Sequence, residues 1–291
     1  MKKSTEEIVF NIVALTITTL FALACLLPIV LTISGSFTSE RAIYQGLKLI
    51  PAEFSTAAYK MILKNPGEML NAYKVTLIIV AVGTCLGLIL TSMTAYVLYR
   101  KDFKYRNAFS FYYFFTTLFG GGLVPGYIVT CALGLRNTYT VLIITGAFSV
   151  FNMIVMRTYF TGNIPQALVE SAKIDGANDF KIYTSIVMPS ATPILATIGL
   201  LLALAYWNNW NTAMLYIDDK SLYPLQYYLY RIFQTTQMST IMAEAGVDTQ
   251  QVPQEGYKLA MTVFTMGPVI LFYPFVQKYF VAGVTVGAVK G

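Results

Sequence analysis

Long stretches without a single charged residue are the feature that most constrains how this chain can fold. A membrane-spanning helix needs about 20 consecutive, mostly apolar residues, and backbone inside a bilayer is satisfied only in helices or closed barrels. The stretches are continuously apolar and lack the alternation of a half-buried strand, which indicates helices. We therefore expect an all-α integral membrane protein. The charge-free stretches are 8–39, 75–99, 107–135, 137–156, 182–217 and 259–277.

Composition supports the same class, because 56% of the residues are hydrophobic and only 12% are charged. Soluble domains carry about 25% charged residues. We predict six transmembrane helices in one transmembrane domain over 1–291. Gly267, Pro268 and Pro274 interrupt the last of them, as membrane helices tolerate. The spans are expected at about 8–33, 75–99, 107–131, 139–158, 191–216 and 259–281, with a large cytoplasmic loop at 159–190.

Basic residues near the span ends predict the orientation. Lys and Arg accumulate in cytoplasmic loops, and four of them crowd the short segment 100–106. The N-terminus is therefore expected inside, and an even number of spans places the C-terminus inside as well. The first apolar run is longer than the core of a signal peptide, which is about 7–15 residues. We expect this first span to be retained.

Histidine and cysteine narrow the chemistry. The sequence contains no histidine, which excludes a Ser-His-Asp triad, a His metal site and a His proton relay. Cys25, Cys85 and Cys131 all lie in predicted spans with no zinc-ligand spacing, so we interpret them as packing residues. No basic face coincides with a soluble domain, so no nucleic-acid partner is expected.

Glycine patterning bears on nucleotide binding. No Gly-x-x-x-x-Gly-Lys-Ser/Thr sequence occurs, so this chain is not expected to hold ATP itself. The glycine run at 120–122 lies within an apolar span without a following lysine. It is interpreted as a helix-packing site or a break in the helix.

The segment between the fourth and fifth spans is polar and patterned. Pro165 suits a first helical turn, with Asn163 as the cap before it, and 166–174 reads as a short helix. Gly176 fits the position just beyond a helix end. Asn178 or Asp179 can cap a second helix, which we expect to stop before Pro189.

One face of the first short helix is small and carries a single carboxylate. Ala167, Glu170, Ser171 and Ile174 share this face by helical spacing. The backbone of another protein could approach such a face closely. The residues alone leave two interpretations open, a docking element or an amphipathic loop lying on the bilayer.

The same segment resembles a known motif. The sequence Glu-Ser-Ala-x-x-Asp-Gly-Ala at 170–177, with nine residues from Ala177 to Ser185 before Ile-x-Met-Pro at 186–189, is similar to the EAA motif of binding-protein-dependent ABC transporter permeases. Ser171 and Met188 stand where that pattern has Ala and Leu. The tail GVTVGAVKG at 283–291 and the segments AYWNNWN at 205–211 and YPLQ at 223–226 resemble the carbohydrate, MalG-type group. The resemblance covers nearly the whole chain and implies a MetI-like ABC importer permease fold.

The resemblance implies a role for the loop and for the tail. The loop would form a coupling helix that docks on a cytoplasmic ATPase, with Gly176 at its bend and Glu170 facing basic groups. The tail residues Gly287, Ala288, Val289, Lys290 and Gly291 would reach into the ATPase dimer interface. The residues assigned to ATPase coupling are Glu170, Ser171, Ala172, Asp175, Gly176, Ala177, Ile186 and Pro189.

It also implies the partners. The chain would be a non-enzymatic permease subunit in a bacterial cell membrane, with both termini cytoplasmic. A second homologous permease subunit would complete a heterodimer, two ATPase subunits would use ATP and Mg²⁺, and an extracellular solute-binding protein would deliver a carbohydrate, expected to be an oligosaccharide. This chain itself would bind no cofactor and no metal.

The substrate pathway is predicted from one polar, aromatic stripe. Trp207, Asn208 and Asn211 share a helical face, with Trp210 beside them. Polar side chains in a span tend to face a bundle interior, and amides and indoles suit sugar hydroxyls and C–H faces. Asn152 is a further candidate. A polar interhelical contact with an aromatic belt at the membrane interface explains the same residues equally well.

Three alternatives differ in the residues that they require. A permease of the same ABC type could carry a non-sugar solute. A secondary transporter would need carboxylates inside the spans, and every Asp and Glu lies outside the charge-free stretches. A membrane-embedded, glycan-handling enzyme would need acid/base carboxylates at a span end, where Asp218 and Asp219 form the adjacent pair.

Overall fold

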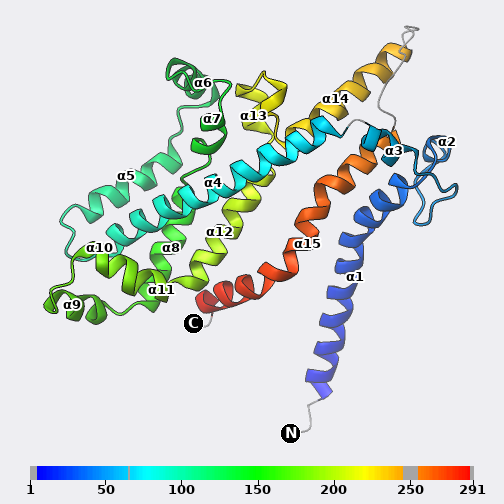
Figure 1. Ribbon diagram of the computed structural model, residues 1–291. Helices are drawn as coiled ribbons and strands as arrows, with labels where there is room; N and C mark the ends of the chain where they lie inside the picture. The colour runs from blue at the N-terminus through cyan, green and yellow to red at the C-terminus, as the bar shows by residue number, and fades with distance from the viewer. Residues whose placement is uncertain (1–4, 65, 245–254, 289–291) are drawn as a thin grey trace. The chain divides into compact units, whose positions relative to one another are not determined.

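The computed structural model describes residues 5–64, 66–244 and 255–288. Its secondary structure within these ranges is helical apart from an isolated antiparallel bridge between Thr38 and Phe54. The chain divides into two compact units, residues 1–66 with 229–269, and residues 67–228 with 270–291. That the two units act as the single domain expected from the sequence stays a prediction; Figure 1 labels their helices.

The first unit begins with a long apolar helix. Helix α1 (Thr5–Ser36) is followed by α2 (Glu40–Ile43) and α3 (Ala57–Lys64). Ser39 caps α2 by accepting from the Ala42 amide. The unit also takes in parts of α14 (Leu225–Glu244) and α15 (Glu255–Ala288).

Glu40 provides a carboxylate cap for another helix in this unit. Its Oε1 accepts from the Glu255 amide at 2.8 Å and its Oε2 from the Gly256 amide at 3.0 Å. Both amides belong to the first turn of α15, where the helix has unpaired donors and the positive end of its dipole. Glu40 thereby fixes the start of α15 against the segment that carries α2.

The second unit is a helical bundle that holds most of the buried side chains. In Figure 1, α4, α8 and α12 run beside one another. Its complete helices are α4 (Gly67–Tyr99), α5 (Arg106–Leu118), α6 (Leu123–Ala132), α7 (Tyr139–Ile144), α8 (Val150–Asn163), α9 (Gln166–Ile174), α10 (Asp179–Ile182), α11 (Met188–Ser190), α12 (Thr192–Trp207) and α13 (Asn211–Tyr216).

Small residues let α4 and α12 approach closely. A side chain at Gly83 would meet the Tyr206 ring, and one at Gly87 would meet Leu202. The four-residue spacing of these glycines is the small-xxx-small pattern that permits close packing of membrane helices. The bundle core continues from this crossing toward the ends of α4, α8 and α12 with Leu98, Met156, Phe160, Ile182 and Ile198.

Two described helices are each long and apolar enough to cross a membrane, 6–36 within α1 and all of α4. Two bent helix pairs are also long and apolar enough to cross a membrane when each pair is taken as one span. They are α5 with α6, bent by 113°, and Asp179–Ser190 with α12, bent by 83°. The bend between α5 and α6 falls at Gly122, whose φ of +86° favours glycine. Of the two roles predicted for the glycine run, the structure shows the break.

The helix boundaries refine several predicted spans. The segment 107–131 is divided between α5 and α6, and 139–158 between α7 and α8. The segment 191–216 is divided between α12 and α13. The segment 259–281 lies within α15.

Candidate functional site

The first arm of the polar loop forms the short helix that the sequence predicts. Helix α9 spans Gln166–Ile174. Pro165, predicted in its first turn, instead occupies the position just before the helix with extended backbone, so that placement is wrong. The cap predicted at Asn163 is wrong. Asn163 is the last residue of α8, where its Nδ2 donates to the Tyr159 carbonyl at 3.0 Å, so its side chain is used to close the preceding helix.

The bend after α9 is built by Gly176. Its φ of +81° lies in the left-handed region, and nothing stands within 4 Å of a side chain at this position, so backbone conformation alone favours glycine. The Gly176 amide donates to the Lys173 carbonyl at 3.0 Å, and the Ala177 amide to the Ala172 carbonyl at 2.9 Å. These two bonds make a Schellman motif, which confirms the predicted helix end.

The second arm starts as predicted and ends later than predicted. Asn178 caps α10 by accepting from the Lys181 amide at 2.8 Å. A π-helical turn, Tyr183–Val187, then leads into α11, so Pro189 lies inside a helix and the predicted stop before it is wrong. In a regular α-helix the proline ring clashes with the carbonyl four residues earlier. The wider π turn, in which the Met188 amide donates to the Tyr183 carbonyl, directly precedes that position.

The two arms together, residues 166–190, are called the 166–190 loop below. Its inner face joins the bundle core through Val169, Ala172, Ile182 and Val187, which are all buried. Ala172, predicted to take part in coupling, therefore packs inward. Ile186 packs against the same core and is half-buried.

The outer face of the loop is the small face expected from the sequence. Ala167, Glu170 and Ser171 are exposed, and Ile174 is 87% exposed. Phe180, on the second arm, is 68% exposed. The first arm thus exposes one large apolar side chain near a carboxylate and small residues, and the second arm exposes another. Asp175 and Pro189 are also exposed, and Ala177 is half-buried.

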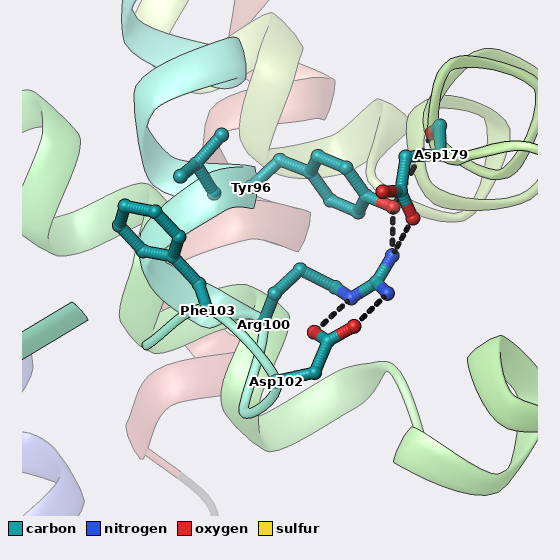
Figure 2. Close-up of a pocket in the computed structure, with 6 residues that line it drawn as sticks. Tyr96, Arg100, Asp102, Phe103 and Asp179 are labelled. Atoms are coloured by element: carbon teal, nitrogen blue, oxygen red, sulfur yellow. Dashed lines mark hydrogen bonds and ion pairs between the residues drawn. The ribbon is translucent and has the colours of Figure 1, made fainter. Parts of the chain in front are cut away.

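A network of charged groups joins this loop to the end of α4 (Figure 2). Arg100 directly follows α4, and its side chain is only 7% exposed. Its guanidinium donates to both carboxylate oxygens of Asp102, Nε to Oδ1 at 2.9 Å and Nη2 to Oδ2 at 2.7 Å. Nη1 donates to Asp179 Oδ1 at 2.7 Å and to the Tyr96 hydroxyl at 2.6 Å. Lys173 of α9 also donates to Asp102.

The charges in this network reinforce one another. Hydrogen bonds from Arg100 and Lys173 hold the pKa of Asp102 well below its usual range. Burial disfavours charge on Arg100, but the hydrogen bonds to Asp102 and Tyr96 outweigh it and raise the pKa of Arg100. An open cavity of about 380 Å³ borders the network, lined by Tyr96, Val97, Arg100, Asp102, Phe103 and Asp179.

The role of Arg100 was not predicted from the sequence. Arg100 belongs to the basic segment 100–106 that indicates topology, and Asp179 was expected only as a possible helix cap. One local signal was present, because Arg100 is the first charged residue after a long apolar span and an acidic residue follows two positions later. The partnership with α9 and α10 joins residues more than 70 positions apart, and no local pattern indicates it.

The predicted substrate stripe does not form one helical face. Helix α12 ends at Trp207 and α13 begins at Asn211. The Asn208 Nδ2 donates to the Leu204 carbonyl at 2.9 Å, and Asn209 Oδ1 accepts from the Thr212 amide at 3.1 Å. Asparagine side chains compete with the helical ladder in this way. Asn208 closes the last turn of α12, and Asn209 pairs with an amide in the first turn of α13.

The residues of the stripe have different surroundings. Trp207 is 8% exposed, and its indole N–H is without a hydrogen-bond partner in the described part of the chain. Asn208, Trp210 and Asn211 are exposed. Asn152 is 8% exposed in the first turn of α8. Among the described residues, no hydrogen bond joins Asn152 to the other four.

The predicted tail site lies at the edge of the described residues. Gly287 and Ala288 fall within α15, whereas Val289, Lys290 and Gly291 lie outside the described ranges. Within the described ranges, no group of three or more His, Cys, Asp or Glu residues is arranged to hold a metal.

Comparison with known proteins places these features in context. Residues 83–286 match the family described as binding-protein-dependent transport system inner membrane component. The chain is 39% identical, over 94% of its length and 95% of the relative, to the polygalacturonan/rhamnogalacturonan transport system permease protein YtcP of Bacillus subtilis. It is 28% identical to the trehalose/maltose transport system permease protein MalG of Thermococcus litoralis, covering 98% of this chain and 99% of the relative.

A solved structure is similar over the same extent. It is a chain of a bacterial ABC transporter involved in the import of the acidic polysaccharide alginate. The TM-score is 0.82 with 31% sequence identity, and the match covers 96% of this chain and 99% of that one.

Proposed function

The chain belongs to the family of binding-protein-dependent transport system inner membrane components, and we propose that it is the permease subunit of an ATP-driven importer for oligosaccharides. Membership confirms the resemblance found in the motif at 170–189 and the all-α, MetI-like permease fold. A permease of this family is a transporter subunit, not an enzyme.

The single observation that carries the proposed mechanism is the 166–190 loop. It presents Ile174, Phe180 and Glu170 outward, while Val169 and Ile182 anchor it to the core. Exposed large apolar side chains on a rigidly anchored polar loop favour docking on another protein over contact with water. We assign that partner as a cytoplasmic ATPase, which places the loop and both termini on the cytoplasmic side of a bacterial cell membrane.

The other partners follow from the family. A second, homologous permease subunit would form the translocation path with this chain, two ATPase subunits would bind and hydrolyse ATP with Mg²⁺, and an extracellular binding protein would deliver the solute. ATP-driven closure of the ATPase pair would rock the helices through the docked loops. We further propose that residues 287–291 contact the ATPase pair.

The substrate class rests on the relatives. YtcP is named for polygalacturonan and rhamnogalacturonan, MalG for trehalose and maltose, and the solved importer for alginate. All of these are carbohydrates, and fragments of acidic polysaccharides are the first to test. Uptake of a radiolabelled oligogalacturonide by cells that carry the complete transporter should be abolished by deleting this chain. Uptake of an amino acid or a metal ion instead would contradict the proposal.

The docking role is tested by Ile174→Glu. Removing a buried apolar contact of this size costs about 1.5–3 kcal/mol, which corresponds to about tenfold or more in affinity. The ATPase should therefore co-purify with wild-type permease and be lost from the variant. Ile50→Glu is the matched control, because Ile50 is also largely exposed, at 79%, in a loop proposed to lie on the opposite side of the membrane. Equal ATPase recovery in both variants would contradict the docking surface.

We retain Trp207, Asn208, Trp210, Asn211 and Asn152 as the proposed substrate pathway. The unpaired indole N–H of Trp207 supports it, because a buried donor without a partner is costly unless a ligand satisfies it. Trp207→Phe keeps the aromatic body and removes this donor. We expect lower uptake with unchanged ATPase assembly from Trp207→Phe and from Asn211→Ala, and unchanged uptake from Asn163→Ala. Normal uptake by both Trp207→Phe and Asn211→Ala would contradict the proposed substrate pathway.

A further inference from the structure

The 166–190 loop is bonded to a helix that is remote from it in sequence. The loop connects α8 to α12 in the chain. Side chains of α4 also contact it, although α4 is remote from it in sequence. The Ser92 hydroxyl shares a hydrogen bond with the Tyr183 hydroxyl at 2.7 Å. The Tyr99 hydroxyl donates at 2.8 Å to the carbonyl of Ile164, two residues before the loop begins.

These contacts form one stripe on α4. Ser92, Tyr96, Tyr99 and Arg100 follow the spacing of a single helical face. The Tyr96 ring lies 5.4 Å from the Tyr183 ring between centroids, and its hydroxyl donates to the Asp179 backbone carbonyl at 3.3 Å. The stripe therefore runs along the last turns of α4 and ends at the charged network.

The network at the end of the stripe is built to hold both arms of the loop at once. Arg100 reaches α10 through Asp179, at 2.7 Å. Asp102 reaches α9 through Lys173, whose ammonium also lies 3.8 Å from Asp179 Oδ1. Two cations and two carboxylates thus alternate between α4 and the two arms. The bidentate pair with Asp102 fixes the orientation of the Arg100 guanidinium. The end of α4 is therefore bonded to α10 through Arg100 and Asp179, and to α9 through Asp102 and Lys173.

From this geometry we infer that Arg100, with Asp102, Asp179 and Lys173, is a transmission latch: positioning residues that make α4 move with the 166–190 loop when the ATPase moves it. The inference rests on the proposed coupling function. Arg100 touches neither ATP nor substrate in this scheme. Its task is to convert a displacement of the loop into a displacement of α4, which packs along α8 and α12 at the centre of the bundle.

A weakened latch should separate ATP hydrolysis from transport. Asp179→Asn keeps the size of the side chain and removes the charge that faces Arg100. The complex should still assemble with the ATPase and hydrolyse ATP. The amount of oligosaccharide moved per ATP should fall by about fivefold or more, the size of a typical coupling free energy.

Asp218→Asn is a closely matched control. Asp218 accepts from Arg136 at 2.7 Å, the distance of the Arg100–Asp179 pair, and both aspartate side chains are 67% exposed. This second pair lies apart from the 166–190 loop in sequence and joins 136 to 218, so its loss should leave the transport-to-ATP ratio unchanged. Arg100→Lys is a second test variant, because it keeps the charge and removes the fork that bonds Asp102 and Asp179 together.

The experiment uses the complete transporter reconstituted in proteoliposomes, with oligogalacturonide as substrate, and measures ATPase recovery, ATP hydrolysis and uptake in the same preparation. A lower transport-to-ATP ratio in Asp179→Asn and Arg100→Lys, but not in Asp218→Asn, supports the latch. An unchanged ratio overturns it while leaving the docking role intact. Loss of the assembled complex in both variants also overturns it and assigns the network to assembly. Absence of any ATPase from the wild-type complex would instead refute the proposed function itself.

Discussion

Gly83 is where a single methyl group should disturb the packing of the bundle. The Cβ of an alanine there would lie 2.4 Å from Tyr206 Cζ and 2.6 Å from Cε2. The ring cannot simply swing aside, because its hydroxyl donates to the Ile143 carbonyl at 2.6 Å and Gly146 lies against its other edge. Overpacking of this kind costs about 1–3 kcal/mol, and breaking the Tyr206 bond adds about 1 kcal/mol.

The free energy of unfolding of purified protein in detergent, measured with a denaturant series, checks this expectation for Gly83→Ala. Gly126→Ala is the control, since Gly126 lies in α6 with nothing within 4 Å of the added atom, and it should be neutral or slightly stabilising. The destabilisation should largely vanish in a Tyr206→Leu background, as a double-mutant cycle would show. An equal loss with and without the tyrosine ring would refute the argument.

Three further predictions concern the loop, the network and the first unit. Gly176→Ala should destabilise the protein by about 1 kcal/mol, because φ there is +81°; an unchanged denaturation midpoint would contradict the assigned turn. Asp102 has a lowered pKa in the folded state, so its contribution is complete above the unfolded pKa near 3.8 and is lost as the pH falls below that value. At pH 7, Asp102→Asn should therefore be less stable than wild type, by about 1 kcal/mol or less because the side chain is half-exposed. Below pH 3.8 the stability of the variant should approach that of wild type. Glu40→Ala should lower the free energy of unfolding by about 1–2 kcal/mol through loss of the α15 cap. Glu40→Gln can still accept hydrogen bonds, so its loss should be smaller. Equal losses in both variants would contradict a capping role.

The features predicted correctly from the sequence are those fixed by neighbouring residues. Helix α9, the glycine turn at Gly176 and the cap at Asn178 each depend on a few consecutive side chains and on backbone preferences. The outward face of α9 also followed from helical spacing alone, because one apolar side, with Val169 and Ala172, packs inward.

The features that were missed depend on choices made elsewhere in the fold. Asn163 could cap either of two helices, and it closes the one before it. Pro189 is accommodated by a π turn that residue preferences do not indicate. The break at Asn208 was hidden because the charge-free stretch 182–217 runs across it. Arg100 finds Asp179 only after α4 has packed beside the loop, which involves residues 79 positions apart.

Cross-linking between the 166–190 loop and the ATPase tests the central claim most directly. Ser171 and Ser221 are both exposed serines, the first on the outer face of α9 and the second in the turn before α14. In a chain whose cysteines at 25, 85 and 131 are replaced by serine, Ser171→Cys should cross-link to the ATPase subunit through a short thiol-reactive linker, and Ser221→Cys should not. Cross-linking of Ser221→Cys alone, or of neither position in an ATPase-containing complex, would contradict the account.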